Sequence, residues 1–357
     1  LYFNSYLENY VDPSAGSEIA GAQGAVNEVG AQGLEFDHQR IQPDSDYAAD
    51  DTYAIDFKPA VDGTALYTQS SYAVGAGGNI ILGVGNSNDY FISFQVKAPT
   101  LTGTGVFLNP QGIVNAASFS PFTAGVSPGE FLSLFGTGLA AQTVTASALP
   151  FPTTLGGDQV TISWVDSTNK TVTAQAPIYT VSSGLISIVV PYNIPTDGTF
   201  LNFQVTNGST KSNVATVFSG GAQPGIFTQD LSGLGNGAIR RTTDNSVVTS
   251  ANPAKVGETV AIYLTGLGVV SPAITAGSAA PSNPLSTAIT PDVFIDGVQA
   301  NVLYAGLAPG LAGLYQLNVT IPTGVTPGAN VTVEVDSYDS QDILLAINAQ
   351  ATIPISK

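Results

Sequence analysis

Two copies of one short stretch decide the fold of this chain. Residues 127–139 read SPGEFLSLFGTGL, and residues 255–267 read KVGETVAIYLTGL. In both copies a Gly-Glu turn precedes a run of alternating apolar residues, and a Thr-Gly-Leu turn follows it. Gly129 and Gly257 are 128 residues apart, and so are Gly138 and Gly266. A stretch that recurs at a fixed spacing indicates two structural units of one kind.

The similarity of the two copies continues downstream. LISIVVP at residues 185–191 corresponds to LYQLNVTIP at residues 314–322, shifted by a few residues as loop insertions require. Closing strands are expected at 199–206 and 213–218 in the first copy and at 330–335 and 343–353 in the second. About seven short strands in about 100 residues is what an immunoglobulin-like sandwich contains. The expected fold is therefore all-β, with tandem immunoglobulin-like β-sandwiches at 106–222 and 223–357.

Residues 1–105 lack the repeat but also have the pattern of β-structure. Strand-like runs at 52–57, 65–72, 79–84 and 90–96 are separated by turn signals. We predict an additional N-terminal β-rich region, which begins with an extended segment of aromatic and apolar residues. A Gly, Ala, Gln and Glu-rich run follows that segment through Gly33, and it is consistent with a short helix or a spacer.

The charge of the chain argues against two classes of partner. Nine basic residues stand against 26 acidic ones, which gives a formal net charge of −17. Nucleic-acid binding needs lysine and arginine to neutralise phosphates, and an anionic membrane surface would repel the same excess of acid. Apolar runs such as residues 185–190 are also far shorter than the roughly 20 residues that span a bilayer. We therefore expect neither a nucleic-acid partner nor membrane insertion.

The chain contains no cysteine and no methionine. Without disulfides or cysteine metal sites, its stability has to come from packing and from hydrogen bonds between strands. Because translation begins with methionine and this sequence begins with Leu1, we interpret it as a segment cut from a precursor by signal-peptide removal or another processing step. A trimmed chain is the alternative. Few oxidisable side chains suit long residence outside the cell, so the expected location is extracellular or at the cell surface.

Several short motifs of the repeated region are similar to those of a known family of proteins. They are VNAASF at 114–119, the turn segment at 127–139, PGIFT at 224–228, NPA at 252–254, and YAGLAPG at 304–310 with GLYQLNV at 313–319. From about residue 106 to its end, the chain resembles secreted bacterial proteins with an uncharacterised C-terminal domain that is abundant in Solibacter and other Acidobacteria. Each copy is also similar to the IPT/TIG branch of the immunoglobulin-like folds. The resemblance implies export and a β-sandwich module, and it brings no activity or catalytic residues.

No residue pattern in the chain indicates an active site. His38 is the only histidine and no Gly-x-Ser-x-Gly motif accompanies it, so we interpret it as a solvated or capping residue. Glu130, Glu258 and Glu334 could supply paired carboxylates for glycoside hydrolysis, but Glu130 and Glu258 occupy equivalent turns of the repeat. Residues at equivalent positions of a repeat usually serve the fold. We predict that the chain is not an enzyme.

Two groups of residues leave binding functions open. Trp164 with Tyr179 and Tyr192 could stack against carbohydrate, although a single tryptophan in a sandwich more often belongs to the core. The densest group of carboxylates could hold calcium, but it lacks an EF-hand spacing, and we favour a turn-rich acidic loop. These carboxylates are Asp44, Asp46, Asp50, Asp51 and Asp56. We expect no cofactor and no metal, with calcium and surface glycans as the alternatives.

The two ends of the chain suggest how it is used. Edge strands of sandwiches either need protection or become joints for strand addition. Our hypothesis is a structural extracellular protein, the subunit of a bacterial surface filament, in which a terminal donor strand completes a sandwich of the next subunit and the polymer grows head to tail. The candidate inter-subunit residues are Leu1, Tyr2, Phe3, Tyr6, Leu7 and Tyr10 at the start and Ile343, Leu344, Leu345 and Ile347 near the end.

Two alternatives to the filament remain. One is a monomeric adhesion or glycan-binding module of a cell-surface protein, which predicts exposed aromatic residues on a concave face. The other is a spacer region of a larger secreted enzyme, which predicts a catalytic domain elsewhere in the full-length protein.

Overall fold

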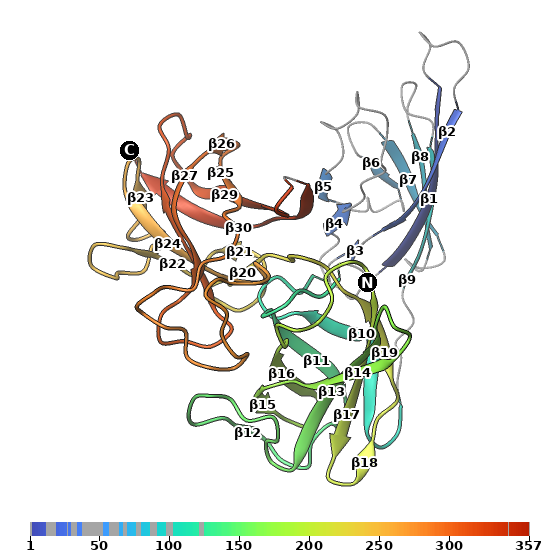
Figure 1. Ribbon diagram of the computed structural model, residues 1–357. Helices are drawn as coiled ribbons and strands as arrows, with labels where there is room; N and C mark the ends of the chain where they lie inside the picture. Colours follow the sequence, from blue (N-terminus) through green and yellow to red (C-terminus); the bar gives the residue numbers. More distant parts are fainter. Residues whose placement is uncertain are drawn as a thin grey trace. The chain divides into compact units, whose positions relative to one another are not determined.

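The computed structural model is built from β-strands, and the residues that it describes contain no helix (Figure 1). It describes residues 103–120, 125–341 and 343–356 with their side chains, and the backbone of strands β1 to β9 within residues 1–100. The predicted all-β fold is confirmed. In the part of the chain that is described, no helix could cross a membrane. The chain divides into two compact units, Leu1–Thr100 and Leu101–Lys357.

The first unit consists of two antiparallel sheets. Its six-stranded sheet has the order β2-β1-β9-β8-β7-β6, and its three-stranded sheet has the order β3-β4-β5. The strands are β1 (Tyr2–Val11), β2 (Ile19–Val26), β3 (Glu28–Val29), β4 (Leu34–Asp37), β5 (Tyr53–Asp56), β6 (Thr64–Leu66), β7 (Ser70–Gly75), β8 (Ile80–Gly85) and β9 (Phe91–Lys97). The additional N-terminal β-rich region is thereby confirmed.

Two details of the first unit differ from the sequence-based expectation. The Gly, Ala, Gln and Glu-rich run, interpreted as a short helix or a spacer, contains β2, which pairs with β1 along its length. Pairing with a neighbouring strand outweighs the weak helix propensity of such a run. The single strand expected at 65–72 is two strands, β6 and β7, paired with each other. Residues 67–69 between them contain no glycine or proline that would mark a break in the sequence.

The second unit begins with sandwich 1, whose two sheets face each other across one hydrophobic core. One sheet has the order β10-β11-β16-β15-β12; the other has the order β14-β13-β17-β18, with β19 also paired to β17. The strands are β10 (Phe107–Asn115), β11 (Phe131–Thr137), β12 (Val144–Thr145), β13 (Asp158–Val165), β14 (Thr171–Gln175), β15 (Ile178–Val181), β16 (Leu185–Val189), β17 (Phe200–Asn207), β18 (Thr210–Lys211) and β19 (Ala215–Phe218). Alternate residues of β13 are buried, as expected for a strand with one face on the core.

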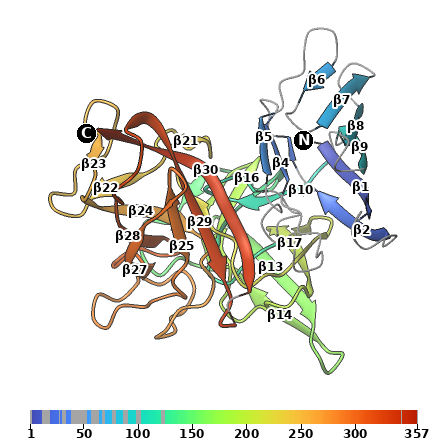
Figure 2. The same cartoon turned by 90° about the horizontal axis from the view of Figure 1, so that it is seen from above.

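Sandwich 2 follows with a second, separate core. One sheet has the order β20-β24-β28-β27, with β22 also paired to β24; the other has the order β21-β30-β29-β25-β26, with β23 also paired to β30. The strands are β20 (Gly225–Ile226), β21 (Gly235–Asn236), β22 (Ile239–Arg241), β23 (Ala254–Lys255), β24 (Thr259–Thr265), β25 (Asp292–Ile295), β26 (Val298–Gln299), β27 (Asn301–Leu307), β28 (Tyr315–Thr320), β29 (Gly328–Tyr338) and β30 (Leu344–Ser356). Figures 1 and 2 show β29 and β30 running side by side as a long hairpin.

The two sandwiches share one strand order. The neighbours β11-β16-β15 of sandwich 1 recur as β24-β28-β27 in sandwich 2, and β14-β13-β17-β19 recurs as β26-β25-β29-β30. Two antiparallel sheets that pack face to face with this order of neighbouring strands are typical of an immunoglobulin-like sandwich. The repeated segments of the sequence form the same strands, since 127–139 leads into β11 and 255–267 leads into β24.

The Gly-Glu turns before β11 and β24 have the same backbone geometry. Gly129 has a φ of 73° and Gly257 a φ of 84°, a backbone conformation that residues other than glycine rarely adopt. In each turn the glutamate N–H donates to the carbonyl oxygen three residues earlier, at 3.3 Å for Glu130 and 3.0 Å for Glu258. The turn at the far end of β24 has a second constraint, because a Cβ on Gly266 would collide with the carbonyl oxygen of Gln223.

Candidate functional site

The two sandwiches of the second unit meet at a polar joint. Sandwich 1 contributes Asn115 at the end of β10 and the turn 127–130 with the start of β11. Sandwich 2 contributes the linker 221–225, the end of β24, and Tyr315 at the start of β28. We call these residues the joint.

Glu130 lies at the centre of the joint and is only 1% exposed. Its Oε2 accepts hydrogen bonds from Ser127 N at 2.8 Å and Ser127 Oγ at 3.1 Å, and its Oε1 accepts one from Asn115 Nδ2 at 2.9 Å. Burial raises the pKa of Glu130 to about 8, against the opposing effect of these three hydrogen bonds. The carboxyl group therefore holds its proton at neutral pH.

Asn115 and Ser127 link the glutamate to the other sandwich. Asn115 Nδ2 also donates to Gln223 O at 3.1 Å, and Ser127 Oγ lies 3.3 Å from Gly266 O as a second possible acceptor of its hydrogen. Both acceptors are backbone carbonyls of sandwich 2. The glutamate and its partners thus form one hydrogen-bonded network that crosses the joint.

Thr265 makes a separate link between the sandwiches. Its Oγ1 accepts a hydrogen bond from Phe131 N at 2.7 Å and donates one to Gly313 O at 3.2 Å. The side chain is fully buried. It satisfies a backbone N–H of sandwich 1 that would otherwise have no partner in a region without water.

Tyr315 closes the joint on the side of sandwich 2. Its hydroxyl donates to Gly268 O and lies 3.4 Å from Pro128 O and 3.3 Å from the hydroxyl of Tyr192, a residue of sandwich 1. Burial raises the pKa of Tyr192 to about 12 and that of Tyr315 well above its ordinary value. Both phenols are therefore neutral hydrogen-bonding groups rather than acids.

The joint has the chemistry of a structural contact. Its bonded side chains, Asn115, Ser127, Glu130, Thr265 and Tyr315, are all committed to other protein groups. The glutamate and Ser127 are buried, so a substrate could reach neither the carboxyl group nor the Ser127 hydroxyl. The predicted role of Glu130 as a turn residue is confirmed by its bond from Ser127 N.

The second copy of the turn shows what the joint adds. Glu258 Oε2 accepts a hydrogen bond from Lys255 N at 3.0 Å, as Glu130 does from Ser127 N, but it also forms an ion pair with Arg241 at 3.2 Å. The two glutamates cap equivalent turns in opposite surroundings, one buried among neutral groups and one partly exposed beside a cation.

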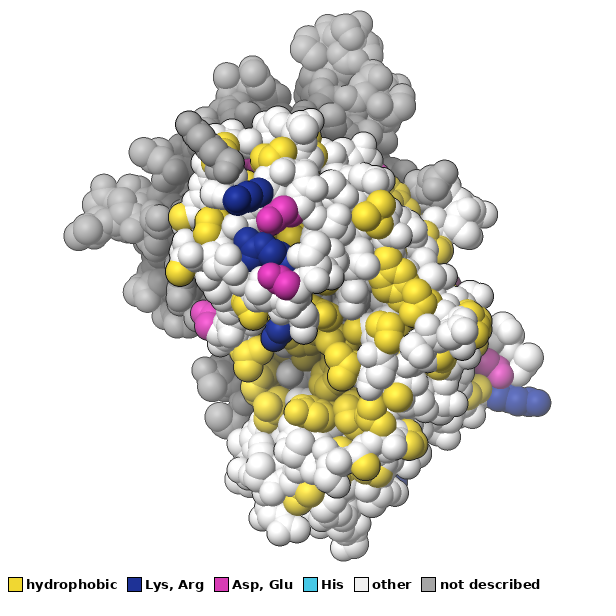
Figure 3. All heavy atoms as spheres, turned by 90° about the vertical axis from the view of Figure 1, so that its left-hand side faces the viewer, with side chains coloured by type: hydrophobic (Ala, Val, Ile, Leu, Met, Phe, Trp, Pro, Cys, Tyr) yellow, Lys and Arg dark blue, Asp and Glu magenta, His cyan; other side chains and the backbone are white. Residues whose placement is uncertain are grey.

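Aromatic side chains gather at the rim of the joint on sandwich 1. The rings of Phe131, Phe151 and Tyr179 lie 5.3–6.4 Å apart, and Phe151 N donates to Gly277 O of sandwich 2 at 2.9 Å. Tyr179 is 40% exposed. Figure 3 shows hydrophobic side chains gathered around a hollow on one face of the molecule, with few charged ones among them.

The structure separates the three aromatic residues that the sequence offered as a carbohydrate platform. Trp164 is 6% exposed and belongs to the core of sandwich 1, which confirms the core interpretation. Tyr192 is bonded to Tyr315 in the joint, and only Tyr179 faces solvent. Asn115, Thr265 and Tyr315 were not predicted as site residues, because nothing in a single sequence shows that two sandwiches meet there.

The three glutamates considered as catalytic pairs also lie apart. Glu130 is in the joint, Glu258 pairs with Arg241, and Glu334 lies on β29 two residues from Asp336. Burial, together with the charges of Glu334 and Asp292, raises the pKa of Asp336 to about 7.

The N-terminal candidate residues lie on a strand that is paired on both sides. Tyr2, Phe3, Tyr6, Leu7 and Tyr10 belong to β1, which lies between β2 and β9. Leu1 is outside the described residues. Donation of this strand to another subunit requires it to leave both neighbours.

The C-terminal candidates lie at the start of β30. Leu344 is opposite Tyr338 and Ile347 is opposite Asp336 on β29, while β21 and β23 pair in parallel with the later part of β30. The side chains of Ile343 and Leu345 are 53% and 37% exposed. The last strand is therefore paired within its own sandwich, and two apolar side chains near its start face solvent.

The remaining candidates lie where side chains are not described. They are His38 and the carboxylates Asp44, Asp46, Asp50, Asp51 and Asp56, the last on the backbone of β5. Among the residues with described side chains, no group of three or more histidine, cysteine, aspartate or glutamate residues is arranged to hold a metal ion.

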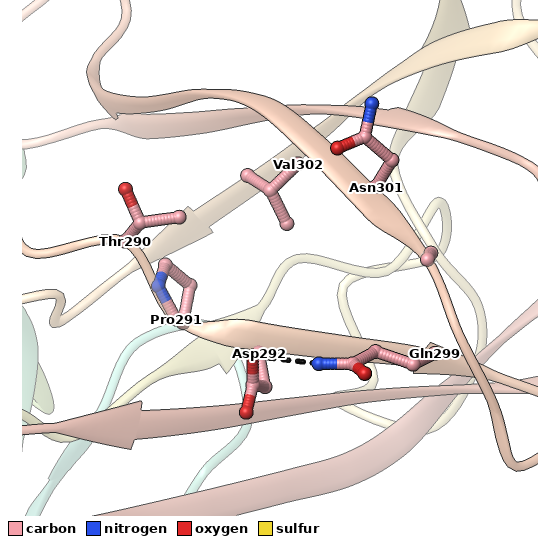
Figure 4. Close-up of a pocket in the computed structure, with 7 residues that line it drawn as sticks. Thr290, Pro291, Asp292, Gln299, Asn301 and Val302 are labelled. Carbon is pink, nitrogen blue, oxygen red and sulfur yellow. Dashed lines mark hydrogen bonds between the residues drawn. The ribbon is translucent and has the colours of Figure 1, made fainter. Parts of the chain in front are cut away.

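A shallow polar hollow of about 450 Å³ lies at one edge of sandwich 2 (Figure 4). Its residues are Thr290, Pro291, Asp292, Gln299, Ala300, Asn301 and Val302. The carboxylate of Asp292 accepts a hydrogen bond from Gln299 Nε2 at 3.0 Å. The lining residues include no histidine, cysteine or lysine.

Comparisons with known proteins show a structural similarity but no match to a protein family. No protein-family model matches the chain, and no curated protein matches it. Among solved structures, it is similar to a tetra-tandem repeat in the extending region of a large adhesion protein, with 15% sequence identity and a TM-score of 0.18. The match covers 99% of this chain and 66% of that chain, which is just under two thirds of the other protein's length.

Replacing Thr265 with valine tests the link between Thr265 and Phe131. Thr265→Val keeps the shape of the side chain but leaves the N–H of Phe131 unpaired, so we expect the free energy of unfolding to fall by about 1–3 kcal/mol. Thr137 is the matched control, since it occupies the equivalent position of the first copy, is exposed, and bonds only to Gly103 O. Urea unfolding of Thr265→Val and Thr137→Val should show the larger loss for Thr265. Equal losses would contradict a special role for Thr265.

Proposed function

We propose that this chain is a structural module of an extracellular or cell-surface protein, in which the two sandwiches act as one stiff unit. The joint carries this proposal. Domains that move relative to each other are usually connected by exposed linkers with few contacts across the boundary. Here residues 222–225 of the linker are buried, and hydrogen bonds of Asn115, Thr265 and Tyr315 cross the boundary.

Stiffness suits a protein that holds a distance or carries tension. To bend at the joint, the chain would have to expose Glu130 and break several buried hydrogen bonds at once. Breaking a buried hydrogen bond costs more free energy than breaking one at the surface, because water does not replace the lost partner. The composition also supports a location outside the cell, because the chain has few charged residues and no cysteine or methionine to oxidise. The resemblance of the sequence motifs to the Acidobacteria-type secreted domain is a further reason for this proposal.

Distance measurements between the sandwiches test the stiffness. The chain has no cysteine, so Thr173→Cys on β14 and Thr332→Cys on β29, both at exposed positions, would carry the only two spin labels. At pH 6 we expect a distance distribution as narrow as that of the control pair Thr145→Cys and Thr173→Cys, which lies within sandwich 1. A distribution several times broader than the control would overturn the proposal of a stiff unit.

Head-to-tail assembly into a surface filament is the form of higher structure that we propose for this module. The exposed Ile343 and Leu345 at the start of β30 favour it, because apolar side chains beside a strand end are available to a second copy. A spacer within a larger secreted protein would use the same stiffness without polymerising.

Electron microscopy of the chain, with and without locked strands, tests filament assembly and the identity of the donor strand. We expect uniform filaments from the unmodified chain. A disulfide between Thr332→Cys and Thr352→Cys would lock β30 to β29, and one between Leu7→Cys and Gln23→Cys would lock β1 to β2, since each pair is directly opposite in its sheet. The lock on the donated strand should abolish filaments, and reduction should restore them. Discrete single molecules at all concentrations would contradict the filament.

Adhesion is a second candidate function, and the aromatic cluster favours it. Phe131, Phe151 and Tyr179 form a partly exposed group of rings at the rim of the joint, and aromatic rings are suited to packing against sugars. In that case the stiff pair of sandwiches would present this surface at a fixed orientation as a single module.

A further inference from the structure

Glu130 is a buried acid with no cation among its described hydrogen-bond and ion-pair partners. Its hydrogen-bond partners Ser127 and Asn115 are neutral, whereas the equivalent Glu258 has Arg241 at 3.2 Å. A buried carboxylate that lacks a counter-charge is unstable in its ionised form. The joint is therefore built around the protonated form of Glu130.

The Ser127 hydroxyl has one hydrogen and two acceptors for it. Glu130 Oε2 lies at 3.1 Å within sandwich 1, and Gly266 O lies at 3.3 Å in sandwich 2. An ionised Glu130 would draw this hydrogen to itself, because a charged acceptor binds more strongly than a neutral carbonyl. A protonated Glu130 can instead donate its own hydrogen to Ser127 Oγ, which leaves the Ser127 hydrogen free for Gly266 O.

We propose that Glu130 is a proton-operated latch of the joint, whose protonated carboxyl group directs the Ser127 hydroxyl to the Gly266 carbonyl and whose loss of that proton to water withdraws the bond. This proposal rests on the proposed structural function and adds a control to it. In the latched state two hydrogen bonds connect the sandwiches: Glu130 donates to Ser127 Oγ, and Ser127 Oγ donates to Gly266 O across the boundary. In the released state the boundary loses one of them and encloses a negative charge, so it opens to admit water.

Among the described residues, Tyr315 on β28 and Tyr192, which follows β16, are the ionisable groups on the elements packed against Glu130. Burial raises the pKa of Tyr192 to about 12 and that of Tyr315 well above its ordinary value, so neither changes its charge in the same range. Asn115 on β10 and Gln223 in the linker do not titrate. Release of the latch therefore follows Glu130 alone.

The direction of the pH dependence follows from where the proton is held. In the unfolded chain Glu130 loses its proton near its ordinary pKa of 4.5, and in the folded chain burial raises that pKa to about 8. Between these values the folded state binds one more proton, so stability falls as the pH rises. The contribution of Glu130 is complete below pH 4.5 and is lost as the pH passes about 8.

The test combines a direct titration with a matched pair of variants of the full chain. We expect the side-chain carboxyl ¹³C signal of Glu130, assigned with Glu130→Gln, to titrate near pH 8. Between pH 5 and 8 the unfolding equilibrium constant of the wild type should rise relative to that of Glu130→Gln by up to tenfold per pH unit. Glu258→Gln is the matched control, because it makes the same change at the equivalent turn outside the joint. The comparison of slopes removes the contribution of Asp336, which titrates in the same window.

The state of the joint is read from the same spin-labelled pair used for stiffness. The distance distribution should be narrow at pH 6 and broaden at pH 9 in the wild type, and Ser127→Ala should be as broad at pH 6 as the wild type at pH 9. A Glu130 signal that titrates below pH 6 would overturn the latch even if Glu130→Gln fails to fold. A distribution that stays narrow at pH 9 would also overturn the latch while leaving the stiff unit intact. A broad one already at pH 6 would instead overturn the stiff unit.

Discussion

The exclusion of water from the joint is the constraint on which the second unit depends. Once two sandwiches press their backbones together, each N–H, carbonyl and side-chain polar group between them has to find a protein partner. Thr265 supplies an acceptor for Phe131 N, Asn115 reaches Gln223 O, and Tyr315 reaches Gly268 O. Glycine at position 266 is required because the Gln223 carbonyl occupies the space of a side chain. The linker therefore becomes part of the packed interior rather than a hinge.

The repeat shows how one turn can serve two purposes. In both copies the turn before the strand, β11 or β24, contains a glycine with positive φ. The glutamate that follows this glycine accepts a hydrogen bond from the backbone of the turn. Solvent and Arg241 stabilise the charge of Glu258 in the second copy. In the first copy the neighbouring sandwich removes the solvent and offers no cation, so the same residue becomes a neutral hydrogen-bonding group. The surroundings of this turn thereby give it the control function that we propose for Glu130.

The sequence was sufficient for the fold and insufficient for the joint. Alternation and turn signals predicted the closing strands at 199–206 and 330–335, which are β17 and β29, and the composition of a sandwich core predicted the burial of Trp164. These features depend on neighbours in sequence or on one sheet. The joint depends on which surfaces of two domains meet, and a single sequence holds no record of that. The one signal was the contrast between Ser127 and Lys255 at equivalent positions, since a lysine could not be buried where Ser127 lies.

The terminal strands illustrate the same limit. Their aromatic and aliphatic character indicated strands correctly, but it could not show that β1 lies between two neighbours or that β30 pairs with β29, β21 and β23. A strand that is suited to donation and one that is suited to its own sheet have the same pattern of residues.

Hydrogen exchange at the amide of Phe131 reports on the joint itself, because this N–H belongs to sandwich 1 and its acceptor, Thr265 Oγ1, belongs to sandwich 2. If the two sandwiches act as one unit, this amide should exchange as slowly as core amides such as that of Ile262, through unfolding alone. Rapid exchange at Phe131, while the amides of both cores remain protected, would show that the joint opens by itself and would contradict the account.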